Sequence, residues 1–180
     1  VVCTTEEAPA EIRKLHGRKL VLFIGSSIGN YDEDAAVALL RGVRGALEQG
    51  DALLLGTDLR KDLATLLPAY DDARGVTAAF NRNVLVRINR ELGANFDTSR
   101  FRHVARWNAL ASRIEMHLES TVDQTVAIPA LGMSVRFRAG ETIHTESSVK
   151  YDLHMVDRVL GRAGFARERT FEDERHWFAV

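Results

Sequence analysis

The sequence has a single cysteine, almost no excess charge and no long apolar run, and each absence excludes a class of protein. Cys3 cannot form a disulfide within the chain, so we expect the protein to work in the cytosol. The 24 basic and 25 acidic side chains give a net charge of -1, which leaves no overall field to attract nucleic acid or a membrane surface. No apolar stretch approaches the ~20 residues needed to cross a bilayer. A small molecule is therefore the expected partner.

Several signatures of enzymes and metal sites are also missing. Ser26, Ser27 and Ser147 do not lie in the sequence context of a nucleophile elbow, and no Walker-type phosphate loop occurs. No repeat, low-complexity tract or obvious linker occurs. The histidines have no metal-ligand spacing with each other or with Cys3, so we predict no metal site. These histidines are His16, His103, His117, His144, His154 and His176.

Two short apolar runs each end in a small, polar turn. Val21–Ile24 runs into Gly25–Asn30, and Ala52–Leu55 runs into Gly56–Asp58. Unbroken apolar runs of this length predict strands of a parallel sheet that are buried on both faces. Ligands of such sheets collect beyond the carboxyl ends of the strands, so we expect the chemistry near Gly25–Asn30 and Gly56–Lys61.

A helical pattern joins the two runs. Ala36, Leu40, Val43 and Leu47 recur three and four residues apart, and either Asp32 or Asn30 can cap the helix. Strand, helix and strand then form a right-handed crossover, which is the repeating unit of a doubly wound sheet.

Two further helices are expected after the second run. A short helix over Lys61–Leu67 should stop before Pro68, because proline disfavours helical geometry in the residue before it. A long helix follows and should end at Gly93. Its apolar residues recur every four positions, at Val76, Phe80, Val84, Ile88 and Leu92.

The period changes to two after about Phe101. Ile114, Met116 and Leu118 alternate with polar residues, which predicts a half-buried strand, and an antiparallel hairpin is expected across Pro129–Gly132. A last helix follows. The fold class is therefore α/β. We predict a doubly wound core of residues 1–69 and 149–180, with residues 70–148 inserted as an α+β lobe.

Three segments are candidate sites, and each has an ordinary structural alternative. Gly25–Asn30 can approach a ligand through its small residues, but Asn30 can equally be a helix cap. Tyr70 can point its hydroxyl into a cleft or pack its ring, while Asp71 and Asp72 suit the positive start of the next helix. Glu146–Ser148, in a predicted loop, suits a ring that donates hydrogen bonds, or an N-cap.

Seven stretches taken together, in this order and spacing, resemble one family. It is the family of histidine-specific, S-adenosylmethionine (SAM)-dependent methyltransferases, and the resemblance runs from about Leu20 to Val180. The stretches are Gly25–Asn30, Leu55–Asp62, Ala69–Ala73, Gly75–Asn81, Arg87–Ala94, Arg113–Leu118 and Thr145–Ser148.

The resemblance implies a class I methyltransferase-like (Rossmann-like) core, here partial, with a substrate-binding lobe. It implies a monomer that transfers methyl groups from SAM to the α-amine of L-histidine, giving trimethylhistidine (hercynine) for ergothioneine biosynthesis. Asn30 and Tyr70 match residues that hold the amino-acid backbone of the substrate. Glu146 and Ser148, with Ser147 between them, match the segment that grips the imidazole. Met116 matches a pocket wall, and no catalytic residue is assigned beyond these positioning residues.

The resemblance also has gaps. The family's glycine-rich cofactor loop and its ribose-binding acid would lie upstream of Val1, so we expect the chain to be the carboxyl-terminal portion of a longer enzyme. Thr4 and Thr5 stand where the family usually has an Asp-Phe pair. Gly25 is then the one cofactor contact assigned here. Two other functions stay open, namely a methyltransferase for another amine and a truncated, non-catalytic remnant that binds an amino acid.

Overall fold

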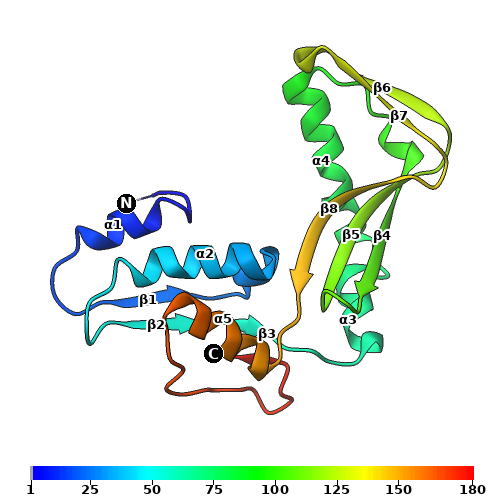
Figure 1. Cartoon of the computed structure of the whole chain (residues 1–180). Helices are drawn as coiled ribbons and strands as arrows, with labels where there is room; N and C mark the ends of the chain where they lie inside the picture. The colour runs from blue at the N-terminus through cyan, green and yellow to red at the C-terminus, as the bar shows by residue number, and fades with distance from the viewer. Residues whose placement is uncertain (1) are drawn as a thin grey trace. The chain divides into compact units, whose positions relative to one another are not determined.

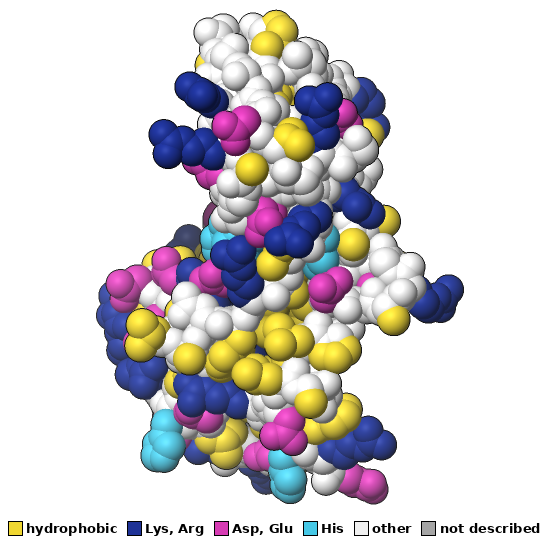
Figure 2. Space-filling model, turned by 90° about the vertical axis from the view of Figure 1, so that its right-hand side faces the viewer, with side chains coloured by type: hydrophobic (Ala, Val, Ile, Leu, Met, Phe, Trp, Pro, Cys, Tyr) yellow, Lys and Arg dark blue, Asp and Glu magenta, His cyan; other side chains and the backbone are white. Residues whose placement is uncertain are grey.

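The structure is a computed structural model that describes residues 2–180 (Figure 1). The chain divides into two compact units. The first unit contains Val1–Lys61 and Ser148–Val180, and the second contains Asp62–Ser147. No helix of residues 2–180 is long and apolar enough to cross a membrane. On the face drawn in Figure 2, basic and acidic side chains are interspersed, as the net charge of -1 suggests.

The first unit is built around two parallel strands joined through a helix. Leu20 pairs with Ala52 and Phe23 with Leu55, which confirms the predicted parallel pair. A second, antiparallel pair brings the last strand of the chain against the segment after β2. The elements are α1 (Ala8–Arg13), β1 (Leu20–Phe23), η1 (Ser27–Asn30), α2 (Glu33–Arg44), β2 (Ala52–Leu55), β3 (Thr57–Asp58), α5 (Leu153–Ala163) and β9 (Phe178–Ala179).

The two main helices of this unit have clear start signals. The Asp32 side chain accepts a hydrogen bond from Ala35 N at 2.8 Å, and Asp152 does the same for Met155 N. Such caps satisfy amide groups that have no partner within the helix. Helices α2 and α5 contact each other and share one core with the strands.

The predicted burial of the parallel strands on both faces is wrong for the described residues. Phe23, Leu53 and Leu55 pack against the helical core, but Leu20 and Leu22 keep 62% and 57% of their surface exposed. The physical reason is that side chains alternate across a strand, and the core formed with α2 and α5 covers one face of this two-stranded sheet.

The second unit is a three-stranded sheet and a hairpin packed with helices. The sheet has the order β4-β5-β8, and Phe101 pairs antiparallel with Ser120. The predicted hairpin is confirmed, with Val126 opposite Val135. The elements are α3 (Leu63–Tyr70), α4 (Val76–Leu92), η2 (Thr98–Arg100), β4 (Phe101–Asn108), β5 (Arg113–Ser120), β6 (Gln124–Ile128), η3 (Pro129–Leu131), β7 (Met133–Phe137) and β8 (Thr142–Val149).

Helix α3 departs from the prediction in two ways. It continues through Pro68 to Tyr70, and Asp71 N donates to Leu67 O at 2.9 Å beyond the proline. A proline loses only its own amide hydrogen bond, so a short helix that buries Leu66 can include it. The helix also lies in the second unit, because it packs on β4 and β5, whereas the predicted domain bounds put most of it in the core.

Helix α4 ends at Gly93 as predicted, with a positive φ of 63°. The side that it buries differs from the predicted apolar stripe. Leu85 and Asn81 are buried, while Val76 and Phe80 are 59% and 68% exposed. The core under the helix is aromatic. The rings of Phe101 and Phe137 meet edge to face, with their centroids 5.4 Å apart.

Candidate functional site

The turn after β1 is fixed by contacts with two other segments of the first unit. Asp58 N donates to Ser26 Oγ at 2.8 Å, and the Tyr151 hydroxyl donates to Ile28 O. A Cβ on Gly29 would lie 3.0 Å from Val149 O, so a side chain at this position would crowd the backbone of Val149. The turn that carries Gly25 and Asn30 therefore lies against the residues that follow Ser148.

Asn30 and Gly25 are both exposed at this turn. The helix after the turn is capped by Asp32, so the interpretation of Asn30 as the cap is wrong. Gly25 has a φ of +73°, which a side chain would disfavour. An exposed amide and an open backbone at the end of a strand are what a ligand turn requires.

A charged cluster follows β2 in the first unit. The Lys150 ammonium is only 1% exposed, and it donates to Ser148 Oγ at 2.8 Å and lies 2.7 Å from Asp58 Oδ2. Lys61 Nζ donates to the other Asp58 oxygen. The cluster ties Ser148 to Asp58 through a buried cation, so the position of the Ser148 hydroxyl is fixed.

In the second unit, β8 places Glu146 and Ser147 beside β5. These residues and Ser148 were predicted in a loop, which is wrong, because all three belong to the strand that ends at Val149. The N-cap alternative also fails, since Asp152 caps α5. The adjacent Thr145 Oγ1 donates to Met116 O at 2.9 Å. Met116 and Glu146 thus come from neighbouring strands.

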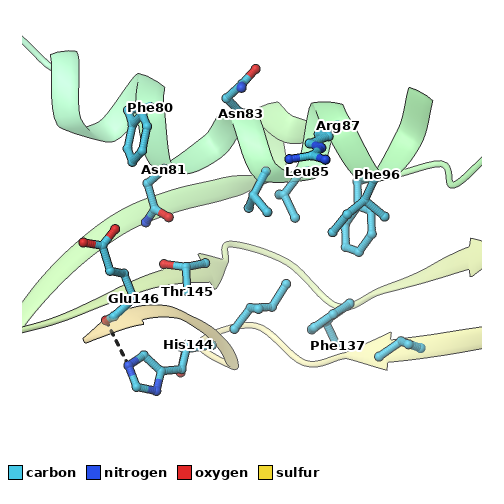
Figure 3. Close-up of a pocket in the computed structure, with 15 residues that line it drawn as sticks. Phe80, Asn81, Asn83, Leu85, Arg87, Phe96, Phe137, His144, Thr145 and Glu146 are labelled. Atoms are coloured by element: carbon cyan, nitrogen blue, oxygen red, sulfur yellow. Dashed lines mark hydrogen bonds between the residues drawn. The ribbon is translucent and has the colours of Figure 1, made fainter. Parts of the chain in front are cut away.

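A pocket of about 740 Å³ lies between α4 and β8 (Figure 3). The Glu146 carboxylate points from β8 toward Asn81 and Phe80 on α4. The other walls are mainly apolar and include Phe96 and Phe137. A single carboxylate in an apolar and aromatic pocket suits a flat ring that donates an N–H hydrogen bond.

The backbone carbonyl of Tyr70 is linked by hydrogen bonds through His103 to Asn81, which lines this pocket. His103 Nε2 donates to Tyr70 O at 2.7 Å, and Asn81 Nδ2 donates to His103 Nδ1 at 2.9 Å. Asn81 also donates to His117 O and is 4% exposed. Sequence reasoning missed Asn81 and His103. The signal available was a polar residue inside an apolar helix, which normally needs a buried partner.

Asp72 has the structural role that the sequence suggested. Its carboxylate accepts from Thr77 N at 2.7 Å and from Val76 N at 3.1 Å, at the start of α4. These hydrogen bonds, of which that from Thr77 is the strongest, lower the pKa of Asp72 to about 2. The residue therefore belongs to the helix start, as the acidic pair was interpreted.

A sequence model of histidine-specific, SAM-dependent methyltransferases matches residues 2–180. The chain belongs to this family. Its mixed α/β architecture agrees with the class I methyltransferase-like fold that the sequence resemblance implied.

Named relatives of the family cover most of this chain. A histidine N-alpha-methyltransferase of Mycobacterium tuberculosis (strain CDC 1551 / Oshkosh) is 50% identical over 164 residues, which are 91% of this chain and 51% of the relative. The corresponding enzyme of Mycolicibacterium smegmatis is 48% identical over 87% of this chain and 49% of its own length. Ergothioneine biosynthesis protein 1 of Neurospora crassa is 30% identical over 93% of this chain and 19% of the relative. The chain thus spans about half the length of the first two relatives.

The described residues fit the family's cofactor only in part. Asp58 is a carboxylate at the end of a strand, where a ribose could bind, but Lys61 and Lys150 pair with both of its oxygens. Gly25 stays a candidate contact because its turn is exposed and open. Residues 2–180 therefore do not complete a cradle for SAM.

Proposed function

We propose that this chain is part of an enzyme that transfers methyl groups from SAM to the α-amine of L-histidine. The proposed product is trimethylhistidine (hercynine), for ergothioneine biosynthesis. The family and the names of the relatives support this reaction. The structural observation that carries it is the Glu146 carboxylate in an apolar and aromatic pocket.

Glu146 would give the enzyme its preference for an imidazole. A carboxylate accepts a charge-assisted hydrogen bond from an imidazole N–H, and a ring without such a donor would leave the carboxylate unpaired. Phe80 lies on the opposite wall, where its exposed ring can contact a flat substrate ring. We further propose that Ser147 and Ser148 assist Glu146 and that Met116 forms part of the wall.

The remaining predicted residues would position the reacting group. We propose that Asn30 and Tyr70 hold the amino-acid backbone of the substrate and that Gly25 contacts the cofactor. SAM supplies an electrophilic methyl group, so the substrate must present a neutral amine, aligned at about 3 Å. Free α-amines have a pKa near 8, so a fraction is already neutral at pH 7 and no dedicated base is required. We also propose that the protein acts as a monomer in the cytosol.

The test is methyl transfer by the complete gene product that contains this chain. With SAM and L-histidine, mass spectrometry should detect products that carry additional methyl groups on the α-nitrogen, and phenylalanine, whose ring has no N–H, should react far more slowly. Glu146→Ala should lower kcat/KM for histidine by about 10- to 100-fold, the size expected for one charge-assisted hydrogen bond. Equal rates with histidine and phenylalanine would refute histidine as the substrate.

A further inference from the structure

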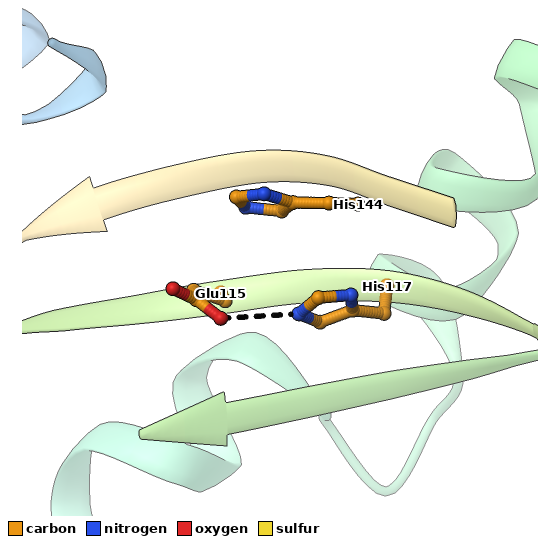
Figure 4. A group of neighbouring side chains, drawn as sticks. All are labelled: Glu115, His117 and His144. Atoms are coloured by element: carbon orange, nitrogen blue, oxygen red, sulfur yellow. Dashed lines mark hydrogen bonds and ion pairs between the residues drawn. The ribbon is translucent and has the colours of Figure 1, made fainter. Parts of the chain in front are cut away.

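Three side chains that can bind a metal ion lie together on β5 and β8 of the second unit (Figure 4). Glu115 and His117 are two residues apart on β5, and His144 lies on the neighbouring strand. The rings of His117 and His144 stack with their centroids 4.8 Å apart. One ligand atom from each of the three residues lies within 4.8 Å of the others. Strand pairing, not spacing along the sequence, brings this group together.

The His117 ring is buried but only partly satisfied. Its Nε2 lies 3.2 Å from Glu115 Oε2 and carries the proton of that contact, since an ionised carboxylate only accepts. Its Nδ1 has no hydrogen-bond partner within residues 2–180, although the residue is 8% exposed. Binding of a metal ion through Nε2 requires the other tautomer of the ring, with the proton on Nδ1.

Glu115 is held in the orientation that a metal ligand needs. Its Oε1 accepts from Asn108 Nδ2 at 2.9 Å and from Arg113 Nε at 2.8 Å, which directs Oε2 toward His117. Carboxylates that bind metals are usually held by neighbours in this way.

We propose that Glu115, His117 and His144 bind one divalent transition metal ion, with Zn²⁺ as the best chemical match. Two imidazole nitrogens and one carboxylate oxygen form a common three-ligand zinc set, and water completes the coordination. The distance of 3.2 Å between Glu115 Oε2 and His117 Nε2 is close to the ~3.4 Å that separates two ligands on a tetrahedral ion with bonds of ~2.1 Å.

His144 must move to complete the site, and its surroundings allow it. The side chain is exposed, and its Nε2 donates to Glu146 O at 3.0 Å and lies 3.1 Å from Ser147 Oγ. When the ring rotates toward His117, His144 loses these two contacts and binds the metal ion instead. The site therefore adjoins the part of β8 that carries Glu146.

The experiment is isothermal titration calorimetry of the whole chain with Zn²⁺, after treatment with a chelator. A Cys3→Ser background removes the exposed thiol as a competing ligand. We expect one ion per chain. His144→Ala and the isosteric Glu115→Gln should each weaken binding at least tenfold. The matched control is His16→Ala, which removes an exposed histidine of the first unit and should leave the affinity unchanged.

Cobalt provides a second readout that does not depend on affinity. Co²⁺ bound by nitrogen and oxygen ligands in a tetrahedral site should give visible absorption bands, and these should disappear in His144→Ala. The proposal is overturned if the parent protein binds Zn²⁺ no more tightly than His144→Ala does. It is equally overturned if His16→Ala loses as much affinity as His144→Ala, since that result indicates binding to scattered surface histidines.

Discussion

Replacement of the buried Lys150 by methionine should strongly destabilise the first unit. Methionine has a similar length but no charge, so the change removes the ammonium that donates to Ser148 and pairs with Asp58. Removal of one partner from a buried ion pair typically costs about 3–5 kcal/mol. Because Lys61 still pairs with Asp58, we expect about 3 kcal/mol. This is a large share of the roughly 5–15 kcal/mol that stabilises a typical domain.

The assay is urea unfolding followed by tryptophan fluorescence. The chain has two tryptophans, Trp107 in the second unit and Trp177 in the first, so a Trp107→Phe background lets Trp177 report the first unit. The control is Lys14→Met, because the Lys14 side chain is 67% exposed and its pair with Glu11 should be worth less than about 1 kcal/mol. A loss of under about 1 kcal/mol for Lys150→Met would refute the argument that the buried cation holds this cluster together.

Three further predictions concern the elements around the candidate site. Burial raises the pKa of Tyr151 to about 12 from its usual 10.0. The stability that the neutral phenol contributes should therefore be present below pH 10 and be lost as the pH rises toward 12. Tyr151→Phe should remove this part of the loss in unfolding curves measured at alkaline pH. The low pKa of Asp72 has the opposite effect on the pH dependence of stability. The stability that its ionised carboxylate contributes is present above about pH 4 and is lost as the pH falls toward 2. Asp72→Ala should therefore speed amide exchange at Val76 and Thr77 at neutral pH, whereas unchanged exchange would contradict the capping role. Gly29→Ala should cost about 1–3 kcal/mol in urea unfolding because its Cβ meets the Val149 backbone, while Gly161→Ala, with open space around it, should stabilise by up to about 1 kcal/mol.

Local sequence patterns predicted the helices and strands of this chain better than they predicted what packs against them. The apolar runs before Gly25 and Gly56 gave two parallel strands, and the alternation around Met116 gave a strand with Ile114 and Leu118 buried. Neither pattern could show that Leu20 and Leu22 remain exposed. Burial depends on which elements cover a face, and that is decided by residues far away in the sequence.

The candidate site shows the same limit. Asn30 and Asp32 were equivalent caps on sequence grounds, and only the backbone geometry assigned the cap to Asp32. Glu146 was expected in a loop, because the many polar residues of β8 hide the alternation of apolar and polar residues that predicts a strand. The proximity of His117 to His144 follows from the pairing of β5 with β8, which no spacing within the chain encodes.

The most direct test of the proposed function is the affinity for L-histidine, measured by calorimetry on the complete gene product and its Glu146→Ala variant. The variant should bind histidine about 10- to 100-fold more weakly and SAM with unchanged affinity, because the lost hydrogen bond belongs to the substrate ring. Glu168→Ala, which removes an exposed carboxylate elsewhere, should match the parent protein in both titrations. If Glu146→Ala binds histidine as tightly as the parent does, Glu146 does not recognise the imidazole, and the assignment of the pocket is wrong.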